Sequence, residues 1–104
     1  MPQARLSGLY WVSAQITVQN RYTSLWTNVG VELSPAANWA LAVGNSAMLE
    51  PGAKDVKISA TGMMQLRTNV RLMWRFVVHT PDMGSENGWI YITNMRLSAM
   101  YITN

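Results

Sequence analysis

The amino-acid sequence predicts an all-β protein, an antiparallel β-sandwich or jelly roll built from about seven to eight short strands. Two observations support this fold class: several runs alternate apolar and polar residues, and turn signals separate them at intervals of about 8 to 15 residues. A third is the lack of any segment that combines helical periodicity with capping residues. At 104 residues the chain has the length of one domain. We expect an N-terminal arm over residues 1–7 and a single sandwich domain over residues 8–104.

The first strand is predicted over residues 8–20, GLYWVSAQITVQN, where the alternation is clearest. The face that we expect to be buried carries Tyr10, Val12, Ala14, Ile16 and Val18. The opposite face carries Trp11, followed by short uncharged polar side chains. Because neither lysine nor glutamate keeps this second face hydrated, two interpretations remain open: an ordinary solvated sheet face, or a surface that meets another protein or a glycan.

Further strands are predicted at residues 25–33, 38–44, 55–66, 89–95 and 96–104. Turns are predicted between them at residues 20–24, 34–38 and 45–54. Pro35 and the pair Pro51-Gly52 support two of these turns, since proline cannot donate a hydrogen bond to a central strand ladder. The longest loop is predicted over residues 80–88, which are rich in Pro, Gly, Asp, Ser and Asn.

The segment over residues 67–80, RTNVRLMWRFVVHT, fits two periodicities, because its arginines recur every four residues. A helix would leave an almost continuous apolar surface with only a narrow polar stripe. A strand sorts the side chains better, and the β-branched and aromatic content agrees with it. The strand would direct inward Val70, Leu72, Trp74, Phe76 and Val78, and outward Arg67, Asn69, Arg71, Arg75 and His79.

Charged residues are scarce: Asp, Glu, Lys and Arg make up 12% of the chain, against about 25% in an ordinary soluble domain. The chain nevertheless contains five Trp, four Tyr and eight Met, more large apolar groups than a core of this size can hide. Such groups, when they gather in an exposed patch, usually mark an interaction surface. We therefore expect a homo-oligomer or a part of a larger assembly, with Trp11 and Trp26 in its interfaces.

The common enzyme and cofactor chemistries have little support in the sequence. There is no cysteine, His79 is the single histidine, and the five acids are scattered without metal-ligand spacing. No glycine-rich phosphate loop or nucleophile-elbow motif occurs. The net charge of +3 is a mild basicity that does not indicate nucleic-acid binding, and no apolar run is long enough to span a membrane. We expect a protein that is not an enzyme and that binds no cofactor or metal.

The row of Arg67, Arg71 and Arg75 is the one basic feature to weigh. Arginine forms bidentate bonds with planar anions, so the row predicts a patch that meets phosphate, an acidic glycan or an acidic partner surface. The alternative is the solvated side of one strand, charged so that the sheet does not pair with a wrong neighbour. Both interpretations remain open.

Two strands follow a recognisable residue pattern. The first strand carries Gly8, Tyr10, Val12, Ala14, Ile16 and Val18, and the last carries Leu97, Ala99 and Ile102. With these residues, and with DVKISATGMMQL and RLMWRFVV between them, the chain resembles the small jelly-roll domains of tailed-phage virion proteins, which belong to the broad tumour-necrosis-factor-like group. The first strand of that group commonly reads Gly-x-Tyr-x-Val-x-Ala-x-Val-x-Val.

The resemblance implies a homotrimer packed around a threefold axis, and a role as a capsid decoration or cement protein, a head fibre or a tail tip. Because Met1 stands only a few residues before the first strand, we expect a stand-alone subunit that binds major capsid or tail proteins in the virion. Its N-terminus has no signal-peptide pattern, so synthesis in the host cytoplasm is expected. The alternative is a carbohydrate-binding or host-receptor-binding module that uses Trp11, Trp26 or Trp89 as a sugar platform and residues 80–88 as its rim.

Overall fold

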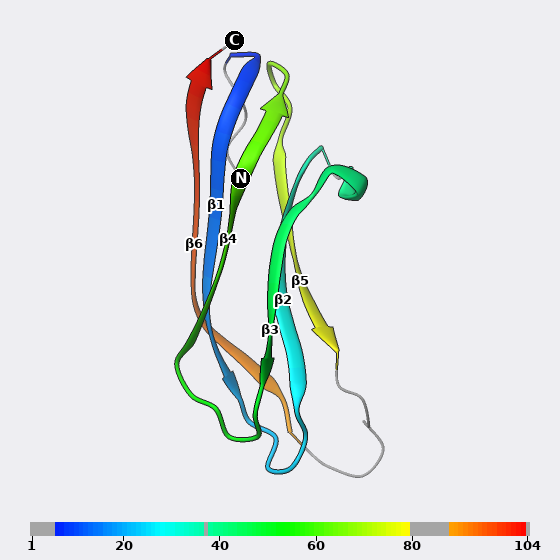
Figure 1. Ribbon diagram of the computed structural model, residues 1–104, viewed down its shortest axis with the longest axis vertical. Helices are drawn as coiled ribbons and strands as arrows, with labels where there is room; N and C mark the ends of the chain where they lie inside the picture. The colour runs from blue at the N-terminus through cyan, green and yellow to red at the C-terminus, as the bar shows by residue number, and fades with distance from the viewer. Residues whose placement is uncertain (1–5, 37, 80–87, 104) are drawn as a thin grey trace.

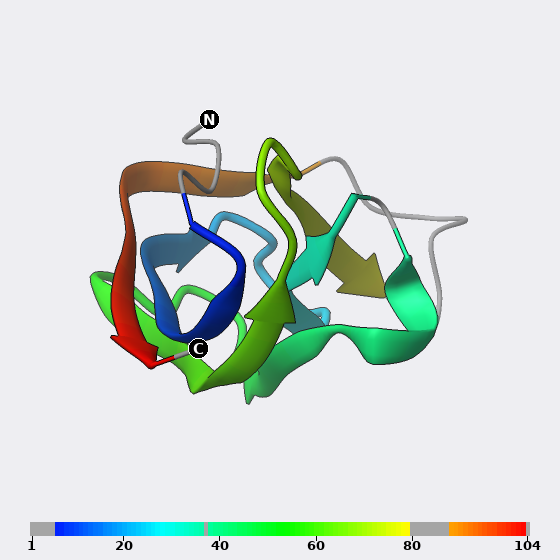
Figure 2. The same ribbon diagram turned by 90° about the horizontal axis from the view of Figure 1, so that it is seen from above.

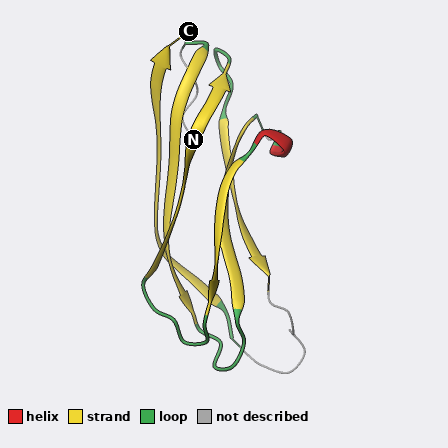
Figure 3. Cartoon of the chain, viewed as in Figure 1, coloured by secondary structure: helices red, strands yellow, loops and turns green. Residues whose placement is uncertain are grey.

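The computed structural model describes residues 6–36, 38–79 and 88–103, and nearly all of this part of the chain is extended (Figures 1 and 3). Its strands are β1 (Gly8–Asn20), β2 (Thr27–Pro35), β3 (Val43–Leu49), β4 (Val56–Leu66), β5 (Leu72–His79) and β6 (Ile90–Thr103), and one short 3-10 helix, η1, covers Trp39–Leu41. They form two three-stranded sheets, β4-β1-β6 and β3-β2-β5, in which all pairs are antiparallel. The predicted all-β sandwich is confirmed.

The alternation of apolar and polar residues decides which side of each sheet is buried. All five apolar side chains predicted to face inward on β1 lie in the core, and they pack against residues of β2 such as Val29, Val31 and Leu33. Figure 2 shows the molecule from above, with the sheet that contains β1 on the left and the sheet that contains β2 on the right. β1 and β2 are the central strands of their sheets, so their outward faces are flanked by a strand on each side.

The two sheets come closest along β3 and β4, which lie next to each other in Figure 1. The Nδ2 group of Asn45 on β3 donates a hydrogen bond to the backbone oxygen of Ser59 on β4, over 2.9 Å. Gly62 on β4 faces Val43, and a Cβ atom at this glycine would lie only 3.0 Å from the Val43 Cγ1 atom. The glycine therefore allows the close approach of the two edge strands.

The strand predicted over residues 67–80 is shorter in the structure. β5 begins at Leu72, and a tight turn precedes it, in which Asn69 has a φ of 69° and the Val70 amide donates to the Arg67 oxygen over 3.0 Å. Within β5 the predicted inward face is confirmed for Leu72, which is buried, and for Trp74 and Phe76, which pack against the core. It is wrong for Val78, which is 51% exposed near the end of the strand. Thr80 lies outside the described residues.

The remaining differences concern boundaries. The segment predicted as a strand over residues 38–44 contains η1, and β3 continues to Leu49 through residues that were predicted as a turn. The two strands predicted over residues 89–95 and 96–104 are one strand, β6, because a register shift opposite the pair Thr17/Val18 absorbs the interruption of the alternation. The described residues therefore contain six strands, several of them long, rather than seven to eight short ones.

The start of the described chain is attached to the sandwich. The Tyr10 hydroxyl donates to the backbone oxygen of Leu6 over 2.7 Å, and the hydroxyls of Ser7 and Thr68 lie 2.9 Å apart. Residues 1–5 of the predicted arm, and residues 80–87 of the predicted loop, lie outside the described residues. In the described ranges, no helix has the length and apolar character needed to cross a membrane.

Candidate interaction surfaces

The outward face of the β4-β1-β6 sheet forms an open groove along β1. The β1 side chains Ser13, Gln15 and Thr17 are half-buried, whereas their neighbours on β4 and β6 are exposed, so β1 is the floor and its neighbours are the walls. A hollow of about 690 Å³ is lined there by Ser13, Ala14, Gln15, Ser59, Thr61, Met95, Arg96, Leu97 and Ser98. A smaller hollow of about 100 Å³ continues it, lined by Gln15, Thr17, Lys57, Asn94 and Arg96. We call the two hollows together the polar groove.

Most of the outward side chains in the polar groove are free to bind a ligand. The Ser13 and Ser98 hydroxyls share a hydrogen bond of 2.6 Å. No hydrogen bond or ion pair within the described ranges involves the side chains of Gln15, Arg96 or Lys57, and the same holds for Asn94. Amide, hydroxyl, ammonium and guanidinium groups thus line the two adjoining hollows.

One end of the same face is apolar. Trp11 on β1 pairs in register with Met63 on β4 and Met100 on β6, so the three side chains form one row across the sheet. Their exposed fractions are 39%, 57% and 63%. The rows on either side of it carry no charge. One row consists of Gln65, Leu9 and Thr103, and the other of Thr61, Ser13 and Ser98. We call the row of Trp11, Met63 and Met100 the apolar end; the sequence identified Trp11 but not the two methionines.

Trp26 and Trp89, the other tryptophans singled out from the sequence, do not share a surface with Trp11. Trp26 is exposed in the loop before β2. Trp89 is exposed before β6, and its backbone oxygen accepts a hydrogen bond from the Arg21 amide, just beyond the end of β1. From Trp11 to Arg21 an extended strand covers about 30 Å. Trp89 also has a neighbouring cation, since the Arg21 Cζ atom lies 5.8 Å from its ring centroid.

The predicted arginine row is not a row on one strand. Arg67 follows the end of β4, Arg71 directly precedes β5, and Arg75 alone lies within it. Arg75 is engaged inside the molecule: its Nε atom lies 2.8 Å from the Glu32 Oε1 atom, and its guanidinium carbon lies 4.2 Å from the ring centroid of Trp39. The strand prediction for residues 67–71 was wrong because Thr68 and Asn69 form a turn, which the four-residue spacing of the arginines does not indicate.

Reversing the charge of Arg75 is therefore expected to affect stability as well as any binding. In Arg75→Glu the new carboxylate would face Glu32 across the strand pair, and we expect a loss of about 1 kcal/mol, limited because both side chains are partly exposed to water. Thermal unfolding of Arg75→Glu and of Arg71→Glu, which breaks no ion pair of the described residues, measures the difference. We expect the melting temperature to fall by about 4 °C in Arg75→Glu and to stay unchanged in Arg71→Glu. Equal melting temperatures would show that the Glu32 pair contributes nothing.

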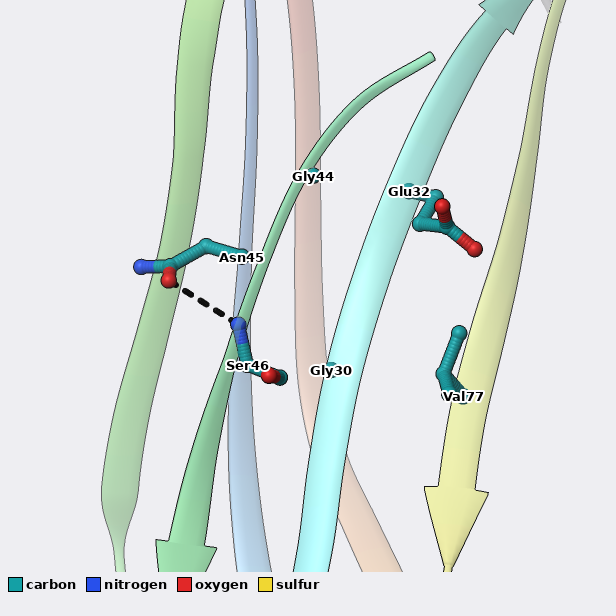
Figure 4. A pocket seen from close by; sticks show the side chains of 6 residues that line it. All are labelled: Gly30, Glu32, Gly44, Asn45, Ser46 and Val77. Carbon is teal, nitrogen blue, oxygen red and sulfur yellow. Dashed lines mark hydrogen bonds between the residues drawn. The ribbon is translucent and has the colours of Figure 1, made fainter. Parts of the chain in front are cut away.

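The outward face of the β3-β2-β5 sheet has a hollow of about 500 Å³, lined by Gly30, Glu32, Gly44, Asn45, Ser46 and Val77 (Figure 4). Its polar groups are already engaged, since Glu32 pairs with Arg75 and the Asn45 Oδ1 atom accepts a 2.9 Å hydrogen bond from the Ser46 amide. Close packing explains why glycines occupy two positions here. A Cβ atom at Gly30 would lie 2.6 Å from the backbone oxygen of Asn45, and one at Gly44 would lie 2.9 Å from the Glu32 Cγ atom. This hollow offers a ligand few free groups.

Groups suited to catalysis do not gather in the described ranges. His79 is exposed at the end of β5, and nowhere in these ranges do three or more His, Cys, Asp or Glu side chains group as metal ligands. Two surfaces with free groups, the polar groove and the apolar end, thus lie on the sheet that contains β1. A separate hollow of about 430 Å³, lined in part by Arg21, Tyr22 and Lys54, lies beyond the end of β1. Comparison of the chain with protein-family models, with curated proteins and with solved structures finds no match.

Proposed function

We propose that the chain is a non-enzymatic virion structural subunit that self-associates, with a trimer as the favoured form. The observation that carries this proposal is the apolar end, where a tryptophan and two methionines are exposed side by side on a rigid sheet. Aromatic residues and methionine are enriched in protein interfaces, and charged residues are depleted at their centres. The apolar end has this composition.

A second copy of the chain is the partner that this surface fits best. Neither the row nor its flanking rows carry a charge, so two copies can approach without repulsion at the contact, and a charged partner would find no complementary group there. Around a threefold axis every subunit contributes the same residues, and those that lie next to the axis meet their own copies. Three copies that each contribute a Trp11 ring would bury the largest exposed side chain of the row.

The virion location rests on the resemblance of the first and last strands to jelly-roll domains of tailed phages. In that role the subunit decorates or cements a capsid, or attaches to a tail, and binds major capsid or tail proteins. Arg67 and Arg71, which flank the turn between β4 and β5, remain as cations for an acidic partner surface. Modest contacts of this kind gain strength when several subunits of an oligomer engage together.

The mass of the purified chain in solution tests the proposal. Light scattering across a dilution series is expected to give three times the chain mass of 11.7 kDa at high concentration, with dissociation on dilution if the contact is small. A constant mass of one chain would contradict self-association. Binding of the chain to purified capsids or tails, measured by co-sedimentation, separately tests the virion part of the proposal.

The polar groove favours a second function, binding of a carbohydrate or of a glycosylated host receptor. Hydroxyl and amide side chains that lack protein partners match the donors and acceptors of sugar hydroxyls. This function uses other residues than the apolar end, so the two proposals can be tested separately. Trp26 and Trp89 lie outside the groove lining, so the platform expected from the sequence would be a different site.

A further inference from the structure

The narrow part of the polar groove has a cation on each wall. Lys57 on β4 pairs in register with Thr17 on β1, and Arg96 on β6 pairs with Gln15. Both cations line the hollow of about 100 Å³, whose other lining residues are Gln15, Thr17 and Asn94. Because the two strands lie on either side of β1, they are separated by about 10 Å, and long side chains from both walls can reach a group held between them.

The two cations are not neutralised by the described part of the protein. The ion pair found in the described residues joins Arg75 to Glu32 on the other sheet, and no acid lines either hollow of the groove. The acid nearest to Lys57 along the chain is Asp55, which directly precedes β4, and its Oδ1 atom already accepts a hydrogen bond of 3.5 Å from Gln19. Lys57 and Arg96 therefore differ from Arg75: they present free charge to a hollow.

The floor of this hollow is polar and neutral. Gln15 and Thr17 are half-buried, and the Gln15 amide has no hydrogen-bond partner among the described residues. An anion seated there would receive charge-assisted bonds from both walls and an amide donor from below. A guanidinium binds a carboxylate or sulfate through two parallel bonds, which also fixes the orientation of the group.

From this geometry we propose that Lys57, Arg96 and Gln15 bind the carboxylate or sulfate group of an acidic sugar, and that the sugar chain continues along the wider hollow. This inference rests on the carbohydrate-binding function proposed above. The wide hollow joins the narrow one through Gln15 and Arg96 and presents the hydroxyls of Ser59 and Thr61, which suits a hydroxyl-rich chain. Single-stranded nucleic acid fits less well, because no aromatic side chain lines either hollow for base stacking.

Calorimetric titration of the full chain with trigalacturonate, maltotriose, inorganic sulfate and a short single-stranded DNA tests this inference. We expect trigalacturonate to bind, maltotriose to bind at least tenfold more weakly, and the affinity for trigalacturonate to fall as salt is raised. Arg96→Gln and Lys57→Gln should each weaken trigalacturonate binding by about ten- to a hundredfold, since each removes a charge-assisted hydrogen bond. Binding of maltotriose by these variants should not change.

Two control variants distinguish loss of the proposed acidic-sugar site from a general loss of positive charge. Arg67→Gln and Lys54→Gln remove the same charges from exposed positions outside both hollows and should leave trigalacturonate binding unchanged. If trigalacturonate and maltotriose bind equally well, and Arg96→Gln changes neither, the carbohydrate function stands and the acidic subsite is refuted. If neither sugar binds, the carbohydrate function itself fails. Equal binding of sulfate or DNA, or equal losses in the control variants, would refute a sugar site and show an unspecific basic surface.

Discussion

Replacing Asn20 with aspartate is expected to lower the free energy of unfolding by about 3 to 5 kcal/mol, although the two side chains have almost the same shape. Asn20 is 1% exposed. Its Nδ2 group donates to the backbone oxygens of Leu25, Leu49 and Glu50 at 3.0, 3.2 and 3.1 Å. In Asn20→Asp a carboxylate would replace this donor and face three carbonyl oxygens, a buried charge without a partner.

The large effect follows from the position of Asn20, where three segments of the chain meet. The side chain joins the end of β1 to the loop before β2 and to the end of β3, and its Oδ1 atom accepts a hydrogen bond of 3.0 Å from the Tyr22 amide. Loss of this amide would therefore loosen the whole end of the sandwich at once.

Urea unfolding followed by tryptophan fluorescence measures the change. Asn94→Asp is the matched control, because it makes the same chemical substitution at an exposed position of β6 and should change stability by less than about 0.5 kcal/mol. Burial among three carbonyl oxygens raises the pKa of the new carboxyl above its ordinary value of about 3.9. The loss in Asn20→Asp should therefore shrink as the pH falls below this raised pKa and be smallest near pH 3, because protonation removes the charge and restores one donor. A loss below 1 kcal/mol at neutral pH would show that the three carbonyls find other donors.

Local alternation predicted the faces of the sheets well. The alternate residues of β1 from Tyr10 to Val18 were correctly assigned to the core, and Leu72, Trp74 and Phe76 to the inward side of β5. The same alternation places Asn20 on the inward face of β1, and a polar residue at an inward position is a signal of a buried hydrogen-bond centre. The prediction placed Asn20 at the boundary between the strand over residues 8–20 and the turn over residues 20–24 and assigned it no role, although its inward position was already a signal.

The candidate sites depend on which strands pair, and alternation within one strand does not contain that information. Trp11 forms the apolar end only because β4 and β6 bring Met63 and Met100 beside it from residues far along the chain. Lys57 and Arg96 line the same hollow from opposite sides of β1 for the same reason, beside Thr17 and Gln15 respectively. The shift of register in β6 also reverses the assignment of alternate residues along that strand. The face of each strand could therefore be predicted from the sequence, whereas the neighbours that a residue meets across the sheet could not, because they depend on the register between distant strands.

The double variant Met63→Lys and Met100→Lys is expected to convert the proposed trimer into a monomer. Both side chains are more than half exposed in the single chain, so lysine is tolerated in the fold, but in an association through the apolar end each ammonium would be buried beside Trp11 without a partner. Burying an unpaired charge costs several kcal/mol, so we expect association to weaken at least about 100-fold. Light scattering at a concentration where the wild-type chain is trimeric measures the change.

Met48→Lys provides the matched control for this variant. Met48 is 54% exposed, close to the 57% of Met63, but it lies on β3 in the other sheet. Met48→Lys should keep the oligomeric mass of the wild-type chain. Equal melting temperatures of this variant and the double variant would show that the lysines disturb the contact between subunits and not the fold. If Met48→Lys dissociates the oligomer while the double variant does not, the subunits meet through the β3-β2-β5 sheet. The apolar end would then have lost its proposed role, and the polar groove would be the remaining candidate on its face.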